Sequence, residues 1–388
     1  MMDQKKGLRT WLEIDRKAIK NNYTIFRSII PQTSKLMAVV KSNAYGHDLV
    51  SFSKEISLCG ADWFGVDSAV EALALRKAGI KKPILVLGYT LPSMLDQAFD
   101  ADVSVSISSF ESLKALEKVK TKKTKKIHIK VDTGMGRQGF LTEDLKKVLD
   151  KLSIFLPRRQ AGNSQFPKIK VEGLFTHFAA AKNPAFPKNT YEQIGKFKKW
   201  IEALRKAGFE PIIHAAASSG TLIFPESHFD MVRIGIGLYG LWPSPEVEAF
   251  SKDKYFLEPI LTWKTIISEI KTLKKGDGVG YDLTEIMNKD KKVAVCPIGY
   301  WHGFPRAFSS IGRVLVGGKR CRVLGRVSMD MIVIDVSQVE NVKVEDEAVI
   351  LGKGGKEEIN ADELARLSGT SNYEVVTRIN PLIKRIYI

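Results

Sequence analysis

Short apolar runs alternate with helical patterns along the first two-thirds of the chain. Eight such runs are rich in β-branched residues, and each is followed by a segment with helical spacing of apolar positions. Near-continuous apolar strands that alternate with amphipathic helices are typical of a parallel sheet covered by helices. The eight predicted strands are Leu36–Lys41, Trp63–Ser68, Pro83–Tyr89, Val103–Ser108, Lys126–Thr133, Val171–Phe178, Pro211–Ser218 and Met231–Gly240.

The segments between these runs carry helix and loop signals of their own. Apolar side chains at positions 49, 52 and 56 recur with helical spacing. Thr190 and Gln193 form a capping-box pattern at the start of another helix, and Gly208 stands where its C-terminal cap belongs. Leu156–Lys168 and Lys182–Asn189 are rich in proline or glycine and are predicted to be surface loops.

Eight strand–helix units predict an α/β fold of the (β/α)₈ TIM-barrel type, with a doubly wound open sheet as the alternative. The pattern changes after Gly240, where Trp242–Pro245 interrupts any helix and strands with glycine turns follow. A single helix is expected near Ala361–Leu367. We therefore expect residues 1–245 to form the barrel and residues 246–388 to form a β-rich C-terminal domain.

Composition narrows the class of protein. The chain has 388 residues, of which 44% are hydrophobic and 27% charged, so a large folded core is expected. No window approaches the roughly 18 apolar residues of a membrane helix, and the start lacks a signal-peptide pattern, which predicts a soluble cytoplasmic protein. The three cysteines Cys59, Cys296 and Cys321 form no C-x-x-C pair, so no metal site is expected.

The formal net charge of +17 raises the question of a nucleic-acid partner. Seven of the thirteen residues from Lys118 to Lys130 are lysines, but no aromatic residues lie between them to stack on bases. A solvated helix end explains this run, and we expect no nucleic-acid partner. A positive field would also favour an anionic substrate or cofactor.

The ends of the seventh and eighth predicted strands suggest a phosphate site. Barrels of this type commonly hold phosphate in the loops after these strands. The seventh ends in Ala217–Gly220 and the eighth in Ile234–Gly237, which supply hydroxyls and glycine amides. Gly235–Gly240 also matches G-x-G-x-x-G, but prolines at 243 and 245 argue against the helix that a dinucleotide site needs. Glycine turns without a ligand remain the other alternative.

Ionisable residues are predicted at the same ends of the strands. Lys41 ends the first strand, Arg137 follows the fifth, His177 ends the sixth and Arg233 lies in the eighth. Each alone has an ordinary explanation, as a solvated cation or a hydrogen-bonded polar residue. Together, a lysine beside a phosphate site and other cations is a candidate Schiff-base former, because neighbouring positive charge lowers the pKa of an amine.

Residues 37–47, Met-Ala-Val-Val-Lys-Ser-Asn-Ala-Tyr-Gly-His, resemble the cofactor-lysine motif of alanine racemases, which are fold-type III pyridoxal-phosphate enzymes. The resemblance covers nearly the whole chain, with further family-like segments in the same order. These segments are Lys130–Arg137, Thr176–Phe178, Val232–Gly240, Gly280–Tyr281, Ile298–Tyr300, Gly325–Asp330 and Asn372–Glu374.

The resemblance implies a two-base racemase of L- and D-alanine. Lys41 would carry pyridoxal 5′-phosphate and handle the proton of D-alanine. Tyr281 would handle the proton of L-alanine from the opposite face, donated by the second domain of the partner subunit in a homodimer. A tyrosine with an ordinary pKa of about 10 is a poor base near pH 7, and lowering it by three units takes roughly 4 kcal/mol. Exposed pairs supply about 1 kcal/mol or less, which favours a closed dimeric site.

The resemblance also implies how the cofactor and substrate are bound. Arg233 would meet the pyridine nitrogen and contact His177. Arg137 would contact the phenolic oxygen and the substrate carboxylate, braced by Lys130, which resembles the carbamylated lysine of the family. The residues implied to hold the phosphate are Tyr45, Ser218, Gly235, Ile236 and Tyr373. The residues implied to bind the substrate carboxylate or narrow the entrance are Met329, through its amide, Tyr300 and Tyr373.

Several positions depart from the family pattern. Trp301-His302 replaces a frequent Ala-Asp, Ala217 replaces an asparagine, Ile234 replaces a proline, and Ser328 precedes the Met-Asp pair. A broader racemase, acting for example on serine or lysine, therefore stays the alternative to an enzyme that supplies D-alanine for peptidoglycan. A fold-type III decarboxylase would lack the Tyr281-type base, and a single-barrel cofactor carrier would lack the second domain.

Overall fold

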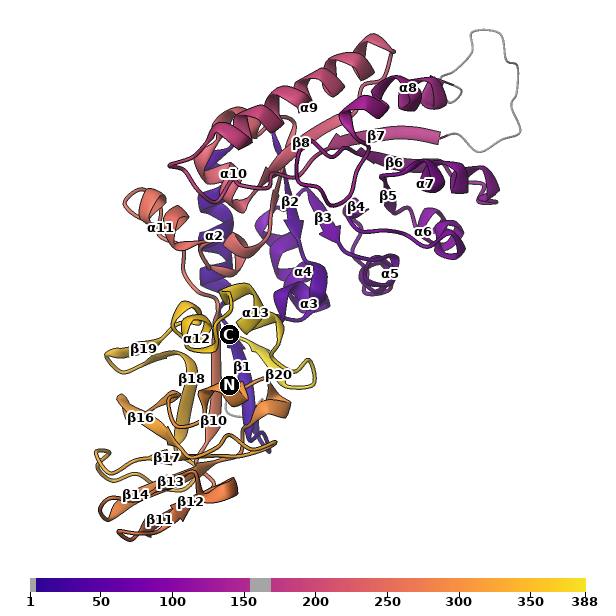
Figure 1. Cartoon of the computed structure of the whole chain (residues 1–388). Coiled ribbons are helices and arrows are strands. Elements are labelled where there is room, and N and C mark those ends of the chain that lie inside the picture. The colour runs from indigo at the N-terminus through magenta and orange to yellow at the C-terminus, as the bar shows by residue number, and fades with distance from the viewer. Residues whose placement is uncertain (1–4, 154–168) are drawn as a thin grey trace. The chain divides into compact units, whose positions relative to one another are not determined.

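The computed structural model describes residues 5–153 and 169–388 (Figure 1). The predicted loop at Leu156–Lys168 lies outside the described residues. The chain divides into two compact units. The described residues of 19–44 and 49–258 form what we call the barrel unit. Residues 5–18, 45–48 and 259–388 form what we call the sheet unit.

Eight parallel strands close into a barrel in the barrel unit, so the predicted (β/α)₈ fold is confirmed and the open sheet is excluded. The last strand pairs with the first, with Leu36 opposite Val232. Met37, Trp63, Leu85 and Met231 form one cluster of the core. The barrel strands are β2 (Lys35–Val39), β3 (Trp63–Val66), β4 (Ile84–Val86), β5 (Ser104–Ile107), β6 (Lys125–Lys130), β7 (Ile169–Phe175), β8 (Ile212–Ala217) and β9 (Met231–Ile234).

Helices surround these strands (Figure 1). The longer ones are α2 (Arg16–Ile29), α4 (Leu49–Cys59), α5 (Ala69–Lys77), α6 (Leu95–Asp100), α7 (Phe110–Ala115), α8 (Leu145–Ser153), α9 (Lys188–Lys206), α10 (Ser218–Ile223) and α11 (Pro245–Ser251). The short turns are α3 (Lys41–Tyr45), η1 (Pro92–Met94), η2 (Leu116–Lys118), η3 (Thr142–Asp144), η4 (Pro225–Ser227) and η5 (Ile236–Tyr239).

Two helix starts differ from the sequence-based expectation. Helix α9 begins at Lys188, after Pro187, and Thr190 is fully buried inside its first turn instead of capping it. Helix α11 begins at Pro245, and the Ser244 hydroxyl accepts the Val247 amide at 3.4 Å. Both differences have one physical reason. The backbone N–H groups in the first turn of a helix have no acceptor within the helix. Proline, which lacks an N–H, therefore loses no hydrogen bond there and can start a helix as well as end one.

The sheet unit holds one long sheet in the order β11-β14-β17-β16-β15-β18-β10-β1-β20, with β19 paired to β18. Its strands are β1 (Thr10–Ile14), β10 (Leu261–Ile266), β11 (Glu269–Leu273), β14 (Lys291–Cys296), β15 (Arg313–Val316), β16 (Lys319–Leu324), β17 (Ile332–Asp335), β18 (Glu347–Gly354), β19 (Glu357–Ile359) and β20 (Lys384–Tyr387). A separate two-stranded ladder joins β12 (Gly278–Val279) and β13 (Glu285–Ile286). The helices and turns of the unit are α12 (Ala361–Ser368), α13 (Asn372–Thr377), η6 (Tyr281–Leu283), η7 (Tyr300–His302) and η8 (Arg306–Phe308).

Strand β1, near the N-terminus, pairs with two strands from the C-terminal part of the chain within the sheet unit. It pairs antiparallel with β10 and parallel with β20, so its backbone is hydrogen-bonded on both edges. The predicted division at 245/246 assigned this strand to the barrel. In the folded chain the strand belongs to the sheet unit, and the two units divide at 258/259. A strand with two neighbours belongs to their sheet wherever it stands in the sequence.

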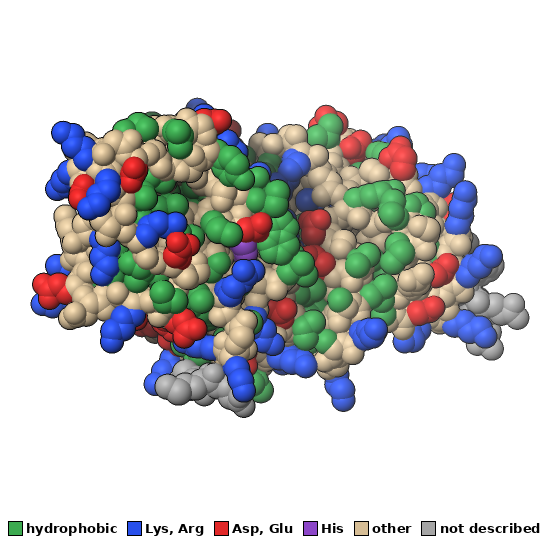
Figure 2. Space-filling model, turned by 90° about the horizontal axis from the view of Figure 1, so that it is seen from below, with side chains coloured by type: hydrophobic (Ala, Val, Ile, Leu, Met, Phe, Trp, Pro, Cys, Tyr) green, Lys and Arg blue, Asp and Glu red, His purple; other side chains and the backbone are tan. Residues whose placement is uncertain are grey.

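Two lysines of the segment Lys118–Lys130 make contacts that stabilise the fold. Lys125 is 5% exposed, and its amine donates to the carbonyl oxygens of Leu116 and Val119 at 2.8 and 3.1 Å, at the end of η2. Lys126 pairs with Asp102 at 2.7 Å. On the face in Figure 2, lysine and arginine side chains are scattered among acidic and hydrophobic ones. The segment is therefore more than the solvated helix end that the sequence predicted.

No helix among the described residues is both long enough and apolar enough to cross a membrane.

Candidate active site

The barrel brings five of the predicted site residues to one rim. Lys41 follows β2, Lys130 ends β6, His177 follows β7, Ser218 follows β8, and Arg233 lies in β9 next to Met37 of β2. The strands are parallel and closed into a barrel, so their carboxyl ends meet at the same rim. In barrels of this type, that rim carries the chemistry.

Lys41 stands at the start of a strained turn. The predicted strand through Lys41 ends at Val39, and Ser42 to Tyr45 all have φ between 51° and 57°. Such left-handed conformations cost about 1–2 kcal/mol per residue outside glycine. Glu71 offsets part of this cost, because its Oε1 accepts the Ser42 amide at 2.7 Å. Strain that the surroundings hold in place is concentrated at functional sites.

Glu71 links two strand ends. Its Oε2 accepts the amide of Asp67, which follows β3, at 2.8 Å, and Asp67 Oδ1 lies 3.5 Å from the Lys41 amine. Sequence reasoning missed Glu71 as a site residue. Its spacing from Ser68 matches a capping box, and the Ser68 hydroxyl does accept the Glu71 amide at 3.3 Å. That signal marks a helix start, and it gave no hint that the carboxylate would reach the Lys41 turn.

Four cations lie close enough to influence one another. Burial and the charges of Arg137, Arg233 and Lys41 lower the pKa of Lys130 to about 8, although Asp132 raises it. Burial and the same cations lower the pKa of His177 to about 3, so this imidazole is neutral near pH 7. A rim with this much positive charge is suited to an anionic ligand.

The loop after β6 is wound around one carboxylate. Asp132 accepts the amides of Gly134, Met135 and Arg137 at 2.8–2.9 Å, which fixes the backbone that carries the Arg137 side chain. The Lys130 amine donates to the Gln138 side-chain oxygen at 2.8 Å. The structure therefore places Arg137 on an ordered turn that directly follows Lys130 at the end of β6.

Arg233 is 4% exposed and spans the inside of the barrel. Its guanidinium donates to the Thr176 and Ala215 carbonyls at 2.9 and 2.8 Å and contacts Nδ1 of His177 and of His214, each at 3.1 Å. Burial lowers its pKa to about 9. All these partners in the described chain are neutral acceptors, so the charge of Arg233 is oriented without being neutralised.

A buried row of polar side chains continues from Arg233. Because the guanidinium only donates, Nδ1 of His214 is the acceptor, and its Nε2 donates to Nδ1 of His128 at 2.9 Å. Nε2 of His128 then faces Glu172 at 3.6 Å, and Ser104 donates to Glu172 at 2.5 Å. Burial lowers the pKa of both histidines, so both are neutral. The apolar pattern of these strands gave no sign of the row, and sequence reasoning missed it.

Ser218 and the glycine turn after β9 form a small hydrogen-bonded group. The buried Ser218 hydroxyl oxygen accepts the Gly235 amide at 3.1 Å and the Gly237 amide at 3.3 Å, with Ile236 between them at the start of η5. A Cβ at Gly237 would lie 2.3 Å from the Phe26 ring, so only glycine fits there. The G-x-G-x-x-G segment thus opens only a four-residue 3₁₀ turn, unlike the long helix of a dinucleotide site.

The remaining predicted residues belong to the sheet unit. Tyr281 lies in η6 between β12 and β13 and is 68% exposed. Tyr300 and Met329 lie on two segments that touch through their backbones, since the Tyr300 amide donates to the Ser328 carbonyl at 3.1 Å. A Cβ at Gly299 would lie 2.2 Å from that same carbonyl oxygen. This close approach explains the glycine before Tyr300.

Tyr45 and Tyr373 form a pair, with ring centroids 6.2 Å apart. Burial raises the pKa of Tyr45 to about 12. Burial and the neighbouring Tyr45 raise the pKa of Tyr373 as well. Both phenols therefore keep their protons near pH 7 and can donate hydrogen bonds to an anion.

The positions that depart from the family pattern have ordinary structural environments. Nδ1 of His302 accepts the Gly299 amide at 3.2 Å and closes η7, while Trp301 packs edge-on against the His302 ring. The Ala217 carbonyl accepts the Thr221 hydroxyl at 3.0 Å inside α10. Ile234 is fully buried in the barrel core.

Known proteins match both units. Residues 14–243 match the family model for the alanine racemase N-terminal domain, and residues 260–387 match the model for the alanine racemase C-terminal domain. An alanine racemase of Methanococcus maripaludis is 39% identical over 97% of this chain and 98% of its own length. One of Halothermothrix orenii is 37% identical over 97% and 96%.

Solved structures agree with these matches. The crystal structure of alanine racemase from Bacillus anthracis with bound L-Ala-P superimposes with a TM-score of 0.89 at 37% identity, covering 98% of this chain and 95% of that one. The alanine racemase structure from Streptomyces lavendulae gives a TM-score of 0.87 at 34% identity over 99% and 98%.

Proposed function

Since the chain belongs to the alanine racemase family, we propose that it interconverts L-alanine and D-alanine with pyridoxal 5′-phosphate and two bases. The observation that carries the proposal is the barrel rim, where the Lys41 amine shares a positive environment with Lys130, Arg137 and Arg233. D-Alanine made in this way in the cytoplasm would supply peptidoglycan synthesis. A racemase with a broader range, including serine or lysine, is the alternative that Trp301 and His302 leave open.

The residues of the rim fit pyridoxal 5′-phosphate. The Ser218 hydroxyl and the Gly235 amide would hold the phosphate, together with the Ile236 amide and the protonated phenols of Tyr45 and Tyr373. Buried hydroxyl and amide donors beside excess positive charge suit a dianion. When bound, the cofactor supplies the electron sink that an α-proton transfer requires. Lys41 would anchor it through Nζ.

Arg233 would donate to the pyridine nitrogen. Its side chain is oriented by His177, His214 and two carbonyls, and such a buried donor needs no reorganisation when charge develops nearby. A cation at this place would keep the nitrogen unprotonated, which would weaken the electron sink and limit side reactions such as transamination.

The substrate carboxylate would be bound by Arg137 and by the Met329 amide, with Tyr300 and Tyr373 narrowing the entrance. Lys130, whose pKa is lowered to about 8, would support Arg137, and its neutral fraction could be carbamylated. Because Asp132 holds three amides of the same turn, Arg137 starts from an ordered backbone. Such preorganisation is what carboxylate binding by a positioned arginine requires.

Two bases would act on opposite faces of the α-carbon. Lys41 Nζ would take the proton of D-alanine, and the Tyr281 hydroxyl would take that of L-alanine. Tyrosine is a base near neutral pH only in a desolvated site beside positive charge, and Tyr281 is 68% exposed in the single chain. We propose that a homodimer covers it, so that Tyr281 of one chain serves the barrel of the other.

A racemisation screen tests the proposal. The purified chain, supplied with pyridoxal phosphate, is incubated with each amino acid in both configurations, and the enantiomers are separated and measured. We expect alanine to be racemised at least tenfold faster than serine or lysine. Comparable rates on several amino acids would favour the broader racemase, and no racemisation of any amino acid would refute the proposal.

The Lys41→Ala variant is the matched control for the cofactor. It should lose both racemisation and the visible absorption of lysine-bound cofactor, because no other amine would take the place of Lys41. A retained band that borohydride reduces would assign the attachment to another lysine.

A further inference from the structure

The loop that carries Tyr281 has little structure of its own. Strands β12 and β13 are two residues long and pair at only two positions, Gly278 with Ile286 and Val279 with Glu285. Between them, Asp282 and Leu283 have φ of 60° and 45°, in the left-handed region that non-glycine residues avoid. An isolated two-stranded hairpin is at best marginally stable in water. Contacts outside the hairpin must therefore hold it.

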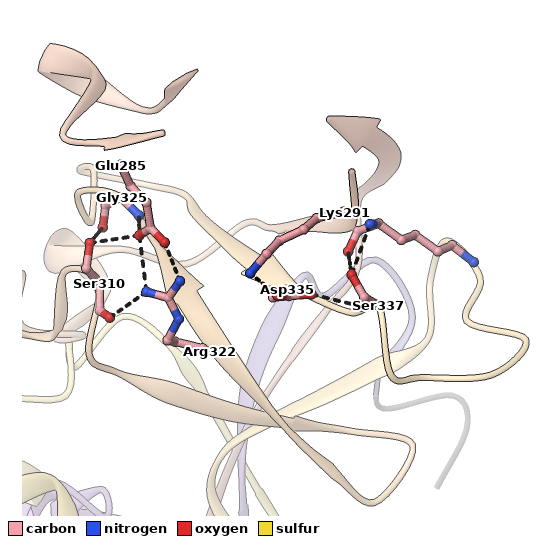
Figure 3. Close-up of polar contacts among 8 residues, drawn as sticks. Glu285, Lys291, Ser310, Arg322, Gly325, Asp335 and Ser337 are labelled. Carbon is pink, nitrogen blue, oxygen red and sulfur yellow. Dashed lines mark hydrogen bonds and ion pairs between the residues drawn. The ribbon is translucent and has the colours of Figure 1, made fainter. Parts of the chain in front are cut away.

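Val279 and Met287 pack in an apolar cluster with Val293 and Leu324, and one carboxylate provides the polar contacts beside that cluster. Glu285, in β13, accepts hydrogen bonds from the Arg322 guanidinium through both of its oxygens, from the Ser310 hydroxyl at 3.0 Å and from the Gly325 amide at 2.8 Å (Figure 3). Its side chain is 15% exposed. Burial raises the pKa of Glu285, but the bonds from Arg322 and Gly325 outweigh burial and lower it overall. A buried carboxylate with this many donors is ionised and fixed.

The partners of Glu285 lead directly to another proposed site segment. Gly325 has φ of 63°, and a Cβ there would lie 2.6 Å from the Val279 carbonyl oxygen, so β12 packs directly on its backbone. The next residue, Arg326, pairs with Asp282 at 3.3 Å. Three residues further along the chain is Met329. The hairpin with Tyr281 and the segment with Met329 are thus tied together.

We propose that Glu285 is the positioning residue for Tyr281: its carboxylate clamps the β12–β13 hairpin to Arg322, Ser310 and Gly325 and so holds the phenol where it can act as a base. This inference rests on the proposed function. Glu285 acts through the hairpin and touches no reacting atom. A phenol about one ångström out of place transfers protons poorly, although its chemistry is unchanged.

The same unit offers a matched control. Asp335 accepts the Lys291 amine at 2.7 Å and the Ser337 amide at 3.0 Å, and its side chain is 21% exposed (Figure 3). This ion pair joins β14 to β17 and shares no residue with the contacts of Glu285. Replacing Asp335 with asparagine removes a carboxylate of similar burial without touching the clamp.

Amide hydrogen exchange tests the clamp itself. In Glu285→Gln, which keeps the size of the side chain and removes its charge, exchange at the amides of residues 278–286 should accelerate at least tenfold. Asp335→Asn should leave those amides within twofold of the unmodified chain. Unchanged exchange in Glu285→Gln would overturn the clamp. If Glu285→Gln fails to fold, Arg322→Lys takes its place in the test. This variant keeps the positive charge and loses the bidentate geometry, so exchange at the same amides should accelerate less than tenfold but more than in Asp335→Asn.

Isotope exchange in D₂O tests the effect on Tyr281. With D-alanine as substrate, Lys41 alone can exchange the α-hydrogen for deuterium with retention, whereas racemisation also needs Tyr281. Glu285→Gln should therefore lower racemisation at least tenfold and keep deuterium incorporation into D-alanine within twofold. Asp335→Asn should preserve both. An equal loss of both rates in Glu285→Gln would overturn the positioning role.

The two failures are distinguishable. If the unmodified chain racemises no amino acid, the proposed function is refuted whatever the hairpin does. If it racemises alanine and Glu285→Gln leaves the ratio of racemisation to exchange unchanged, only the role of Glu285 is refuted.

Discussion

At the scale of single residues, the barrel interior depends on histidines that stay neutral. His128 and His214 are fully buried, His177 is partly buried, and burial lowers the pKa of each. Only a neutral His214 can accept from Arg233 at Nδ1 and donate to a neutral His128 at Nε2. Protonation would place two or three further cations beside Arg233 in a desolvated interior.

This arrangement predicts a loss of stability in mild acid. In the folded chain the pKa of each histidine lies below its unfolded value of about 6.5. Below pH 6.5 the unfolded chain therefore binds protons that the folded chain does not, and the free energy of unfolding decreases as the pH falls. Each histidine contributes a slope of up to about 1.4 kcal/mol per pH unit in that window. Urea unfolding measured from pH 7.5 to 5 should show the midpoint falling steeply below 6.5.

The variant His214→Gln provides the check. Glutamine can both accept and donate hydrogen bonds, but it does not titrate. Between pH 6.5 and 5 the free energy of unfolding of this variant should therefore fall less steeply with pH, by an amount that corresponds to at most one bound proton. The same slope in both proteins would mean that His214 does not contribute to the pH dependence.

At the scale of elements, glycine permits a close contact between two barrel strands. A Cβ at Gly173 in β7 would lie 2.1 Å from Nδ1 of His128 in β6, and this nitrogen is hydrogen-bonded to His214. Gly173→Ala should therefore destabilise the chain by about 1–3 kcal/mol, as overpacking does in a filled core. Thermal or urea unfolding measures this change directly.

Gly195 in α9 is the matched control. A Cβ there meets no heavy atom of the described chain within 4 Å, and the residue is exposed. Gly195→Ala should be neutral or stabilise by up to about 1 kcal/mol, because alanine favours the helix. Equal effects of the two substitutions would show that space around the side chain does not decide them.

At the scale of the whole molecule, the proposed site needs two chains. Mixing inactive Lys41→Ala subunits with inactive Tyr281→Phe subunits should restore activity, because half of the sites in a heterodimer then combine an intact lysine with an intact tyrosine. Recovery approaching one quarter of the normal rate is expected at equal mixing. No recovery, with heterodimers demonstrated by native mass spectrometry, would mean that each chain supplies both bases to its own site.

Much of the fold could be predicted from local pattern. Each of the eight predicted strands overlaps a barrel strand, and Lys41, Lys130, His177, Ser218 and Arg233 lie at the expected strand ends. The strand boundaries could not be predicted as well. The first and last predicted strands extended past Val39 and Ile234, where the chain turns instead, because Val40 in one case and Ile236 and Leu238 in the other continue the apolar pattern. Apolar character alone cannot distinguish a strand from a buried turn.

The sequence by itself determined the order of strands and helices, the family and the rim residues, because these depend on periodicity and on motifs within a few positions of one another. Only the tertiary structure decided that β1 joins the sheet unit, that Glu71 supports the Lys41 turn and that His128 meets His214. It also decided that Glu285 meets Arg322. These partners lie at least 29 positions apart. A contact at such separation leaves no periodic signal in the sequence, since it forms only when packing brings the two segments together.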